Sequence, residues 1–220
     1  MWSAKNIEML LKGVVETLQM TCLSTLFGYV IGLPLGILLR VSDKDGIKPN
    51  AVLYRVLDFI INILRSIPFL ILLILLIPFT RLVVGKSYGT AGTIVPLIVA
   101  AAPFIARMVE SSLKEVDYGV IEAAQSMGAS NKDIILKVLL VEARISLIVG
   151  ATIVFGTILG YSAMAGVVGG GGLGDIAIRY GYYRYESDIM IVTVILLILL
   201  TQLFQIAGMF LARKLDRRRT

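Results

Sequence analysis

Histidine is absent from the 220-residue sequence, and cysteine occurs only once, at Cys22. The lack of histidine excludes serine–histidine catalysis, histidine general bases and most transition-metal sites. A single cysteine excludes an internal disulfide. Charged residues make up only 16% of the chain, whereas an ordinary soluble domain has about 25%. Because 57% of the residues are hydrophobic, the composition excludes a soluble globular protein.

Five long apolar runs fill most of the chain. Four contain no Asp, Glu, Lys or Arg, and the fifth is interrupted only by Arg65. About 20 apolar residues of helix cross a bilayer core about 30 Å thick, so each run is long enough for one span. Barrel strands of about ten alternating residues do not fit these uniformly apolar runs. We therefore predict an all-α, polytopic integral membrane protein with a single domain over 1–220 and five spans at 17–39, 59–80, 88–106, 145–166 and 189–212.

Lys and Arg are divided unevenly between the two sides of these spans. Fourteen of the 21 lie on the side that holds the hydrophilic segment 107–144 and the C-terminus. Six lie on the other side, and Arg65 lies within a span. Cytoplasmic loops carry the excess of Lys and Arg. We therefore predict an external N-terminus and a cytoplasmic C-terminus, whose basic tail at Arg217, Arg218 and Arg219 touches anionic lipid rather than nucleic acid.

Arg65 is the one charge expected inside a span. A cation in the bilayer costs about 2.5–3.5 kcal/mol on insertion scales and is usually paired or faces water. Asp58 and Glu110 are candidate partners for a structural ion pair near the inner leaflet. The alternative is a direct role along a substrate path.

Glycines recur at two places in the spans. Gly28, Gly32 and Gly36 repeat every four residues and align on one helix face, which predicts a contact seam either within one subunit or between two. Gly169, Gly171 and Gly174 formally fit a dinucleotide-binding pattern, but they follow a membrane helix rather than a strand. We predict a tightly packed turn there instead.

The segment 107–144 predicts a cytoplasmic helical hairpin. Its first helix ends at Gly128, because glycine most readily adopts the left-handed conformation of a C-terminal cap. Ser130 and Asp133 have the capping-box spacing that begins a second helix. The apolar face of this second helix is expected from Ile134, Ile135, Val138, Leu139 and Leu140.

This hairpin resembles the EAA loop of permease subunits in bacterial ATP-binding-cassette importers. The family pattern is E-A-A, three residues, G, nine residues and I-x-L-P. The chain has Glu122-Ala123-Ala124, three residues, Gly128, nine residues and then Val138-Leu139-Leu140. Val138 replaces isoleucine conservatively, whereas Val141 in place of the usual proline is a real departure from the pattern, at the point where the chain leaves the second helix.

Further segments are similar to one branch of that family, the five-span permeases for methionine uptake. The matching stretches are GVVETL (13–18), RSIPF (65–69), IVPL (94–97), AAPFIARMVE (101–110), YSAM (161–164) and GGGLG (170–174). The resemblance implies a type I importer permease fold in the bacterial cytoplasmic membrane, arranged as a homodimer. It also implies two ATP-binding subunits, which bind the ATP and magnesium, and an extracytoplasmic substrate-binding lipoprotein. The chain itself would bind no cofactor and would be a transport subunit rather than an enzyme.

The resemblance also implies roles for particular residues. Glu122 would bond at a groove of the ATPase, Ala123 and Ala124 would allow close approach, and Gly128 would permit the turn. By the same analogy, Phe69, Ser162 and Met164 are candidates for lining or gating the translocation path near the dimer axis, and Arg65 joins them as a path candidate because of its charge.

Other functions predict different features in the sequence. An intramembrane enzyme needs paired acids, a serine–lysine arrangement or metal ligands inside the spans, and these groups are missing. A stand-alone channel or secondary transporter predicts intramembrane charges for ion coupling, where only Arg65 is found. Within the importer family, the substrate could also be another small amino acid, a short peptide or another small nutrient, because much of the selection rests with the external binding protein.

Overall fold

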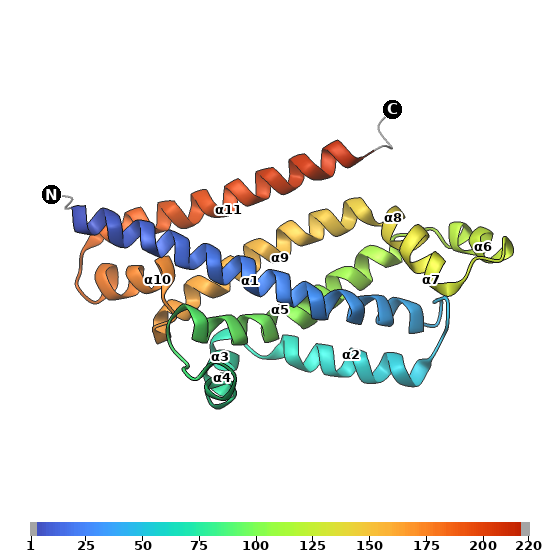
Figure 1. Ribbon diagram of the computed structural model, residues 1–220, viewed down its shortest axis with the longest axis horizontal. Coiled ribbons are helices and arrows are strands. Elements are labelled where there is room, and N and C mark those ends of the chain that lie inside the picture. The colour runs from blue at the N-terminus through green and yellow to red at the C-terminus, as the bar shows by residue number, and fades with distance from the viewer. Residues whose placement is uncertain (1–3, 217–220) are drawn as a thin grey trace.

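The chain folds into long helices that run along one axis of the molecule (Figure 1). This computed structural model describes residues 4–216, so the predicted lipid contact of Arg217, Arg218 and Arg219 lies outside the described residues. The long helices are α1 (Ala4–Ser42), α2 (Ala51–Ser66), α5 (Gly89–Lys114), α9 (Arg144–Ala165) and α11 (Ser187–Leu215). Four helical segments are long and apolar enough to cross a membrane, and the bent pair α2–α3 makes a fifth if it is counted as one span.

The second predicted span needs a correction, because residues 59–80 do not form one continuous helix. α2 ends at Ser66, and the short helices α3 (Phe69–Leu75) and α4 (Ile77–Val84) follow it. The axes of α2 and α3 differ by 99°. Pro68 causes the break, since a residue before proline is driven out of the helical region and Ile67 accordingly has φ −81° and ψ 123°.

The glycine seam of α1 packs against α5 of the same chain. A Cβ added to Gly32 would lie 2.6 Å from the carbonyl oxygen of Ala102, and one added to Gly36 would lie 2.6 Å from that of Ala106. Only glycine allows two helix backbones to approach this closely. The seam therefore serves packing within the subunit, which was the first of the two alternatives.

We expect Gly36→Ala to destabilise the protein by about 1–3 kcal/mol, because the new methyl group overpacks a contact with backbone atoms that cannot move aside. Gly160→Ala is the matched control, since a Cβ at Gly160 meets nothing within 4 Å in the described chain. Thermal unfolding of the two purified variants in detergent measures the difference. Equal melting temperatures would show that the seam is not tightly packed.

A glycine-rich turn closes the end of the molecule opposite the hairpin. It comprises the 3-10 turn η2 (Gly166–Val168), α10 (Gly172–Ile176) and the π-helix η3 (Ala177–Tyr182). A Cβ on Gly174 would lie 2.1 Å from the carbonyl oxygen of Ala163, so the predicted tight packing is confirmed. The Glu16 carboxylate and the Thr17 hydroxyl of α1 accept hydrogen bonds from the backbone N–H groups of Gly172 and Leu173, at 2.8 and 2.9 Å.

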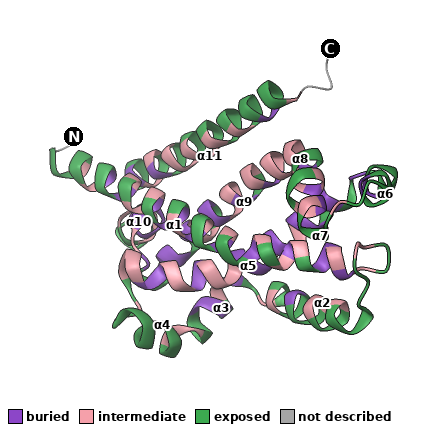
Figure 2. Cartoon of the chain, turned by 45° about the vertical axis from the view of Figure 1, so that its right-hand side comes forward, coloured by how far each residue is buried: buried purple, intermediate pink, exposed green. Residues whose placement is uncertain are grey.

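Burial is concentrated on α5, whereas α11 remains largely exposed (Figure 2). Within α11 only Ile189, Thr193 and Ala212 are buried. Between Ile191 and Leu211 its exposed side chains are apolar except for Gln202 and Gln205, as expected for a helix that contacts lipid. α5 is therefore the central element that positions the parts around it.

Candidate functional site

The hairpin between α5 and α9 begins with α6 (Tyr118–Ser126) and turns at Gly128. Gly128 has φ +77°, and its N–H bonds to the carbonyl of Gln125 at 2.9 Å. The N–H of Ala129 bonds to the carbonyl of Ala124 at 3.1 Å. These two bonds form a Schellman motif, which satisfies carbonyls at the helix end. The predicted left-handed cap at Gly128 is confirmed.

The second arm of the hairpin starts as predicted but winds differently. The Ser130 side chain caps α7 (Asn131–Asp133) by accepting a hydrogen bond from the backbone N–H of Asp133 at 3.2 Å. A hydrogen bond from Lys137, and one from Ser130, hold the pKa of the Asp133 carboxyl below its usual value. The chain then continues as the π-helix η1 (Ile134–Leu139) and α8 (Leu140–Glu142), and no signal in the sequence marked the π winding.

The two faces of α6 have different surroundings. Ile121 and Ala124 are 1% and 5% exposed and belong to the central hydrophobic cluster. Glu122 and Ala123 are exposed, and Glu122 makes no hydrogen bond or ion pair within the described chain. Ala124 is therefore a packing residue of the hairpin itself, whereas Glu122 and Ala123 lie on the face available to another protein.

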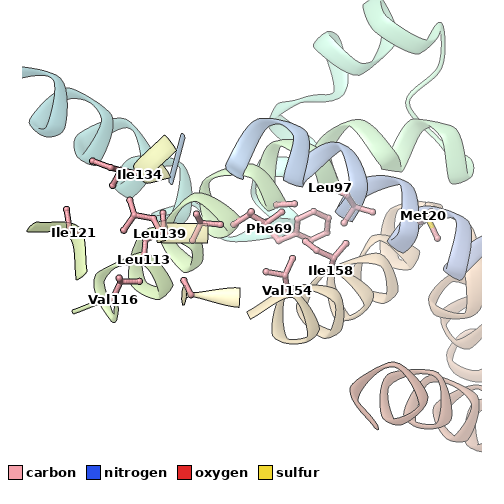
Figure 3. Close-up of a cluster of buried hydrophobic side chains, with 14 of the residues drawn as sticks. Met20, Phe69, Leu97, Leu113, Val116, Ile121, Ile134, Leu139, Val154 and Ile158 are labelled. Atoms are coloured by element: carbon pink, nitrogen blue, oxygen red, sulfur yellow. The ribbon is translucent and has the colours of Figure 1, made fainter. Parts of the chain in front are cut away.

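The buried face of the hairpin is continuous with the core between the long helices. Figure 3 shows Ile121, Ile134 and Leu139 at one end of the cluster and Phe69, Val154 and Ile158 further along it. Protein interiors are closely packed and transmit displacement from one layer to the next. The hairpin and the broken helix thus share one packed core.

Two of the predicted path residues, Arg65 and Phe69, meet at the break between α2 and α3. Both line a cavity of about 170 Å³, together with Phe104 and Tyr161. The rings of Phe69 and Tyr161 stack, with centroids 4.7 Å apart and an angle of 2° between their planes. Phe104 and Tyr161 were not predicted as path residues, although Phe104 lies in the matched stretch AAPFIARMVE and Tyr161 precedes Ser162.

Ser162 and Met164 lie outside the lining of this cavity. Ser162 is 1% exposed, and its hydroxyl donates to the carbonyl of Leu159 at 2.7 Å. Met164 is 46% exposed on the surface of α9. The structure therefore brings together one half of the predicted path residues and separates the other half from them.

An ion network joins α5 to the ends of α1 and α2. The buried Glu110 carboxylate accepts hydrogen bonds from Arg107 at 2.6 Å and from the Tyr54 hydroxyl at 3.0 Å, and pairs with Lys114 at 2.8 Å. Lys114 also binds Asp43 at 2.9 Å.

The expected ion pair of Arg65 with Asp58 or Glu110 is wrong. Arg107 of α5 donates to Asp58 and also to the Asn62 side chain, so the Asp58 carboxylate of α2 is already paired. The physical reason is the rotation of α2, which turns Asp58 toward α5. Arg65 makes no hydrogen bond or ion pair within the described residues and is exposed.

The helical fold, the bent span and the hairpin define a permease component of a membrane transport system. Residues 32–220 match the family described as "Binding-protein-dependent transport system inner membrane component", and the chain belongs to this family. It is 49% identical over 217 residues to the probable D-methionine transport system permease protein MetI of Vibrio cholerae, covering 99% of this chain and 96% of the relative. It is 56% identical over 158 residues to the D-methionine transport system permease protein MetI of Escherichia coli K12, covering 72% and 73% of the two chains.

Solved structures show the same relationship. A chain of the MetNI methionine ABC transporter, in an inward-facing conformation, matches with a TM-score of 0.97 and 51% identity, over 98% of this chain and 100% of that one. A chain of an amino acid ABC transporter solved with histidines has a TM-score of 0.78 at 22% identity and shares the fold. The predicted resemblance and the all-α importer permease fold are confirmed, and the chain is a transport subunit.

Proposed function

We propose that this chain is the membrane-spanning subunit of an ATP-binding-cassette importer that moves methionine, as the D or L form or both, across the cytoplasmic membrane. The names of its relatives and of the transporter with the similar structure support this substrate. The working assembly is a homodimer with two ATP-binding subunits and an extracytoplasmic substrate-binding lipoprotein. ATP and magnesium are bound by the ATPase subunits.

The hairpin is the coupling element of this proposal. One face of α6 carries the exposed Glu122 and Ala123, and it docks on the ATPase. The opposite face packs into the core that contains Phe69. This arrangement is the observation that carries the proposal, because a push on the outer face of α6 reaches the broken helix through close-packed side chains.

The orientation follows from the docking. The hairpin and the C-terminal end of α11 lie at the same end of the molecule, and the N-terminus lies at the other (Figure 1). Because the partner ATPase is cytoplasmic, the hairpin end faces the cytoplasm and the N-terminus faces outward, as the distribution of Lys and Arg favours. The similarity to an inward-facing structure supports a conformation that is open toward this end. We propose that Arg65 and Phe69 belong to the path and that Met164 meets a second copy of the chain as a gate, which its exposure on α9 supports.

Co-expression with the cognate ATPase tests the proposal. We expect the two proteins to copurify, and liposomes that contain the complex to accumulate labelled methionine only with ATP and a methionine-loaded binding protein. The control is the same complex with an ATPase that cannot hydrolyse ATP. Uptake by the chain without any ATPase would contradict the proposal, and ATP-dependent uptake of a different nutrient would contradict the assigned substrate.

A further inference from the structure

Arg65 lies in the last turn of α2, and no acidic side chain among residues 4–216 pairs with it. The two acids that the sequence suggested as partners already accept hydrogen bonds from other side chains. Asp58 accepts from Arg107 and Asn62, and Glu110 accepts from three donors. Structural pairing therefore does not explain why a guanidinium stands at this position. An ionisable side chain inside a membrane span that is not paired points to a ligand or a water-filled path.

The cavity at Arg65 has the chemistry of a small binding site. Its volume of about 170 Å³ is below the roughly 300–1,000 Å³ of pockets for drug-sized ligands, so it suits a single small metabolite. Among the described residues no Asp or Glu lines it, and the lining other than Arg65 is aromatic and aliphatic. The site thus offers one fixed positive charge beside an apolar surface.

The aromatic surface is held firmly. Phe69 is 5% exposed and belongs to the cluster that also holds Val154 and Ile158 (Figure 3). Its ring stacks on Tyr161 of α9. Arg65, in contrast, stands where α2 ends and the chain bends by 99°, so a change in this bend moves the charge relative to the rings.

We propose that Arg65, Phe69 and Tyr161 form a transit site in which the Arg65 guanidinium binds the carboxylate of an amino acid and the rings hold its side chain. This inference rests on the proposed function and names the two groups of the substrate that the permease contacts. A guanidinium presents paired N–H donors that match a carboxylate. A thioether makes favourable contacts with aromatic rings. The site accepts either enantiomer, because contacts to only two groups around the chiral carbon do not distinguish the D from the L form.

The test uses the complete complex in liposomes and measures labelled methionine taken up per ATP hydrolysed. We expect Arg65→Gln to lower this ratio about tenfold or more, because a charge-assisted contact is lost. Arg65→Lys keeps the positive charge but loses the paired N–H donors of the guanidinium, so its ratio of uptake to hydrolysis should be intermediate. Stimulation of ATP hydrolysis by the loaded binding protein should change less than about twofold in both variants, because the hairpin is untouched.

Arg55→Gln is the matched control, since Arg55 is an exposed arginine in the first turns of the same helix and lies outside the cavity. It should leave the ratio unchanged. A parental ratio in Arg65→Gln would overturn the inference, and so would a defect that appears only in vesicles with phosphatidylglycerol and disappears in neutral phosphatidylcholine, which would assign Arg65 to a lipid phosphate. Failure of the parent complex to transport methionine would instead refute the proposed function.

Discussion

ATP-driven uptake should fall to background when Gly128 is replaced by leucine, while the protein still inserts into the membrane. Gly128 has φ +77°, and the left-handed conformation costs a residue with a side chain about 1–2 kcal/mol. A Cβ there meets nothing within 4 Å, so the effect is conformational rather than steric. Leucine favours continuation of α6, which breaks the Schellman bonds and moves η1 out of its packing against Ile121 and Ala124, so α6 loses its connection to the core.

Gly128→Asn provides the control, because asparagine is the other residue that commonly adopts this cap. We expect it to keep most of the uptake. The measurements are methionine uptake, ATP hydrolysis stimulated by the loaded binding protein, and the amount of the variant in the membrane. Normal stimulation and normal uptake by Gly128→Leu would show that the turn does not set the coupling geometry.

Glu110→Ala should destabilise the purified permease by about 3–5 kcal/mol, the range for removing one partner from a buried ion pair. The Glu110 side chain is 2% exposed and accepts from Arg107, Lys114 and Tyr54. Its removal leaves two cations beside each other with only Asp58 and Asp43 to balance them. The ends of α1 and α2 should then separate from α5.

Two variants separate charge from shape in this network. Glu110→Gln keeps the volume and one acceptor oxygen, so we expect a smaller loss than for alanine. Asp43→Asn removes a charge at the edge of the network, where the side chain is 15% exposed, and should cost least. Melting temperatures in one detergent rank the three variants, and a Glu110→Ala protein as stable as the parent would contradict the role of the network.

The hairpin could be predicted from the sequence because its signals are local. Ser130, Asp133 and Gly128 each act through hydrogen bonds or backbone angles within a few residues, and these do not depend on the rest of the fold. The sequence did not predict that Ala123 is exposed while Ala124 is buried, because this difference depends on how α6 is rotated against η1.

Two features could not be predicted from the sequence: the break in the second span, and the use of Asp58 by Arg107 rather than by Arg65. Pro68 was visible, but the flanking residues of α3 and α4 are almost all apolar, so no polarity marks the break. The expected pairing of Arg65 with Asp58 was wrong because the rotation of α2 about its axis turns Asp58 toward Arg107 of α5. A local signal for the true network existed in the spacing of Arg107, Glu110 and Lys114, which places three charges on one face of α5.

The hydrogen bonds from Gly172 and Leu173 to Glu16 and Thr17 join residues 156 positions apart. A ribosome that adds roughly 5–20 residues per second needs about 8–30 s to synthesise that interval. Glu16 and Thr17 of α1 therefore lack these two hydrogen bonds until most of the polypeptide has been synthesised. The packing of α1 on α5 needs only the first 114 residues, so the two ends of the same helix acquire their contacts at different stages of synthesis.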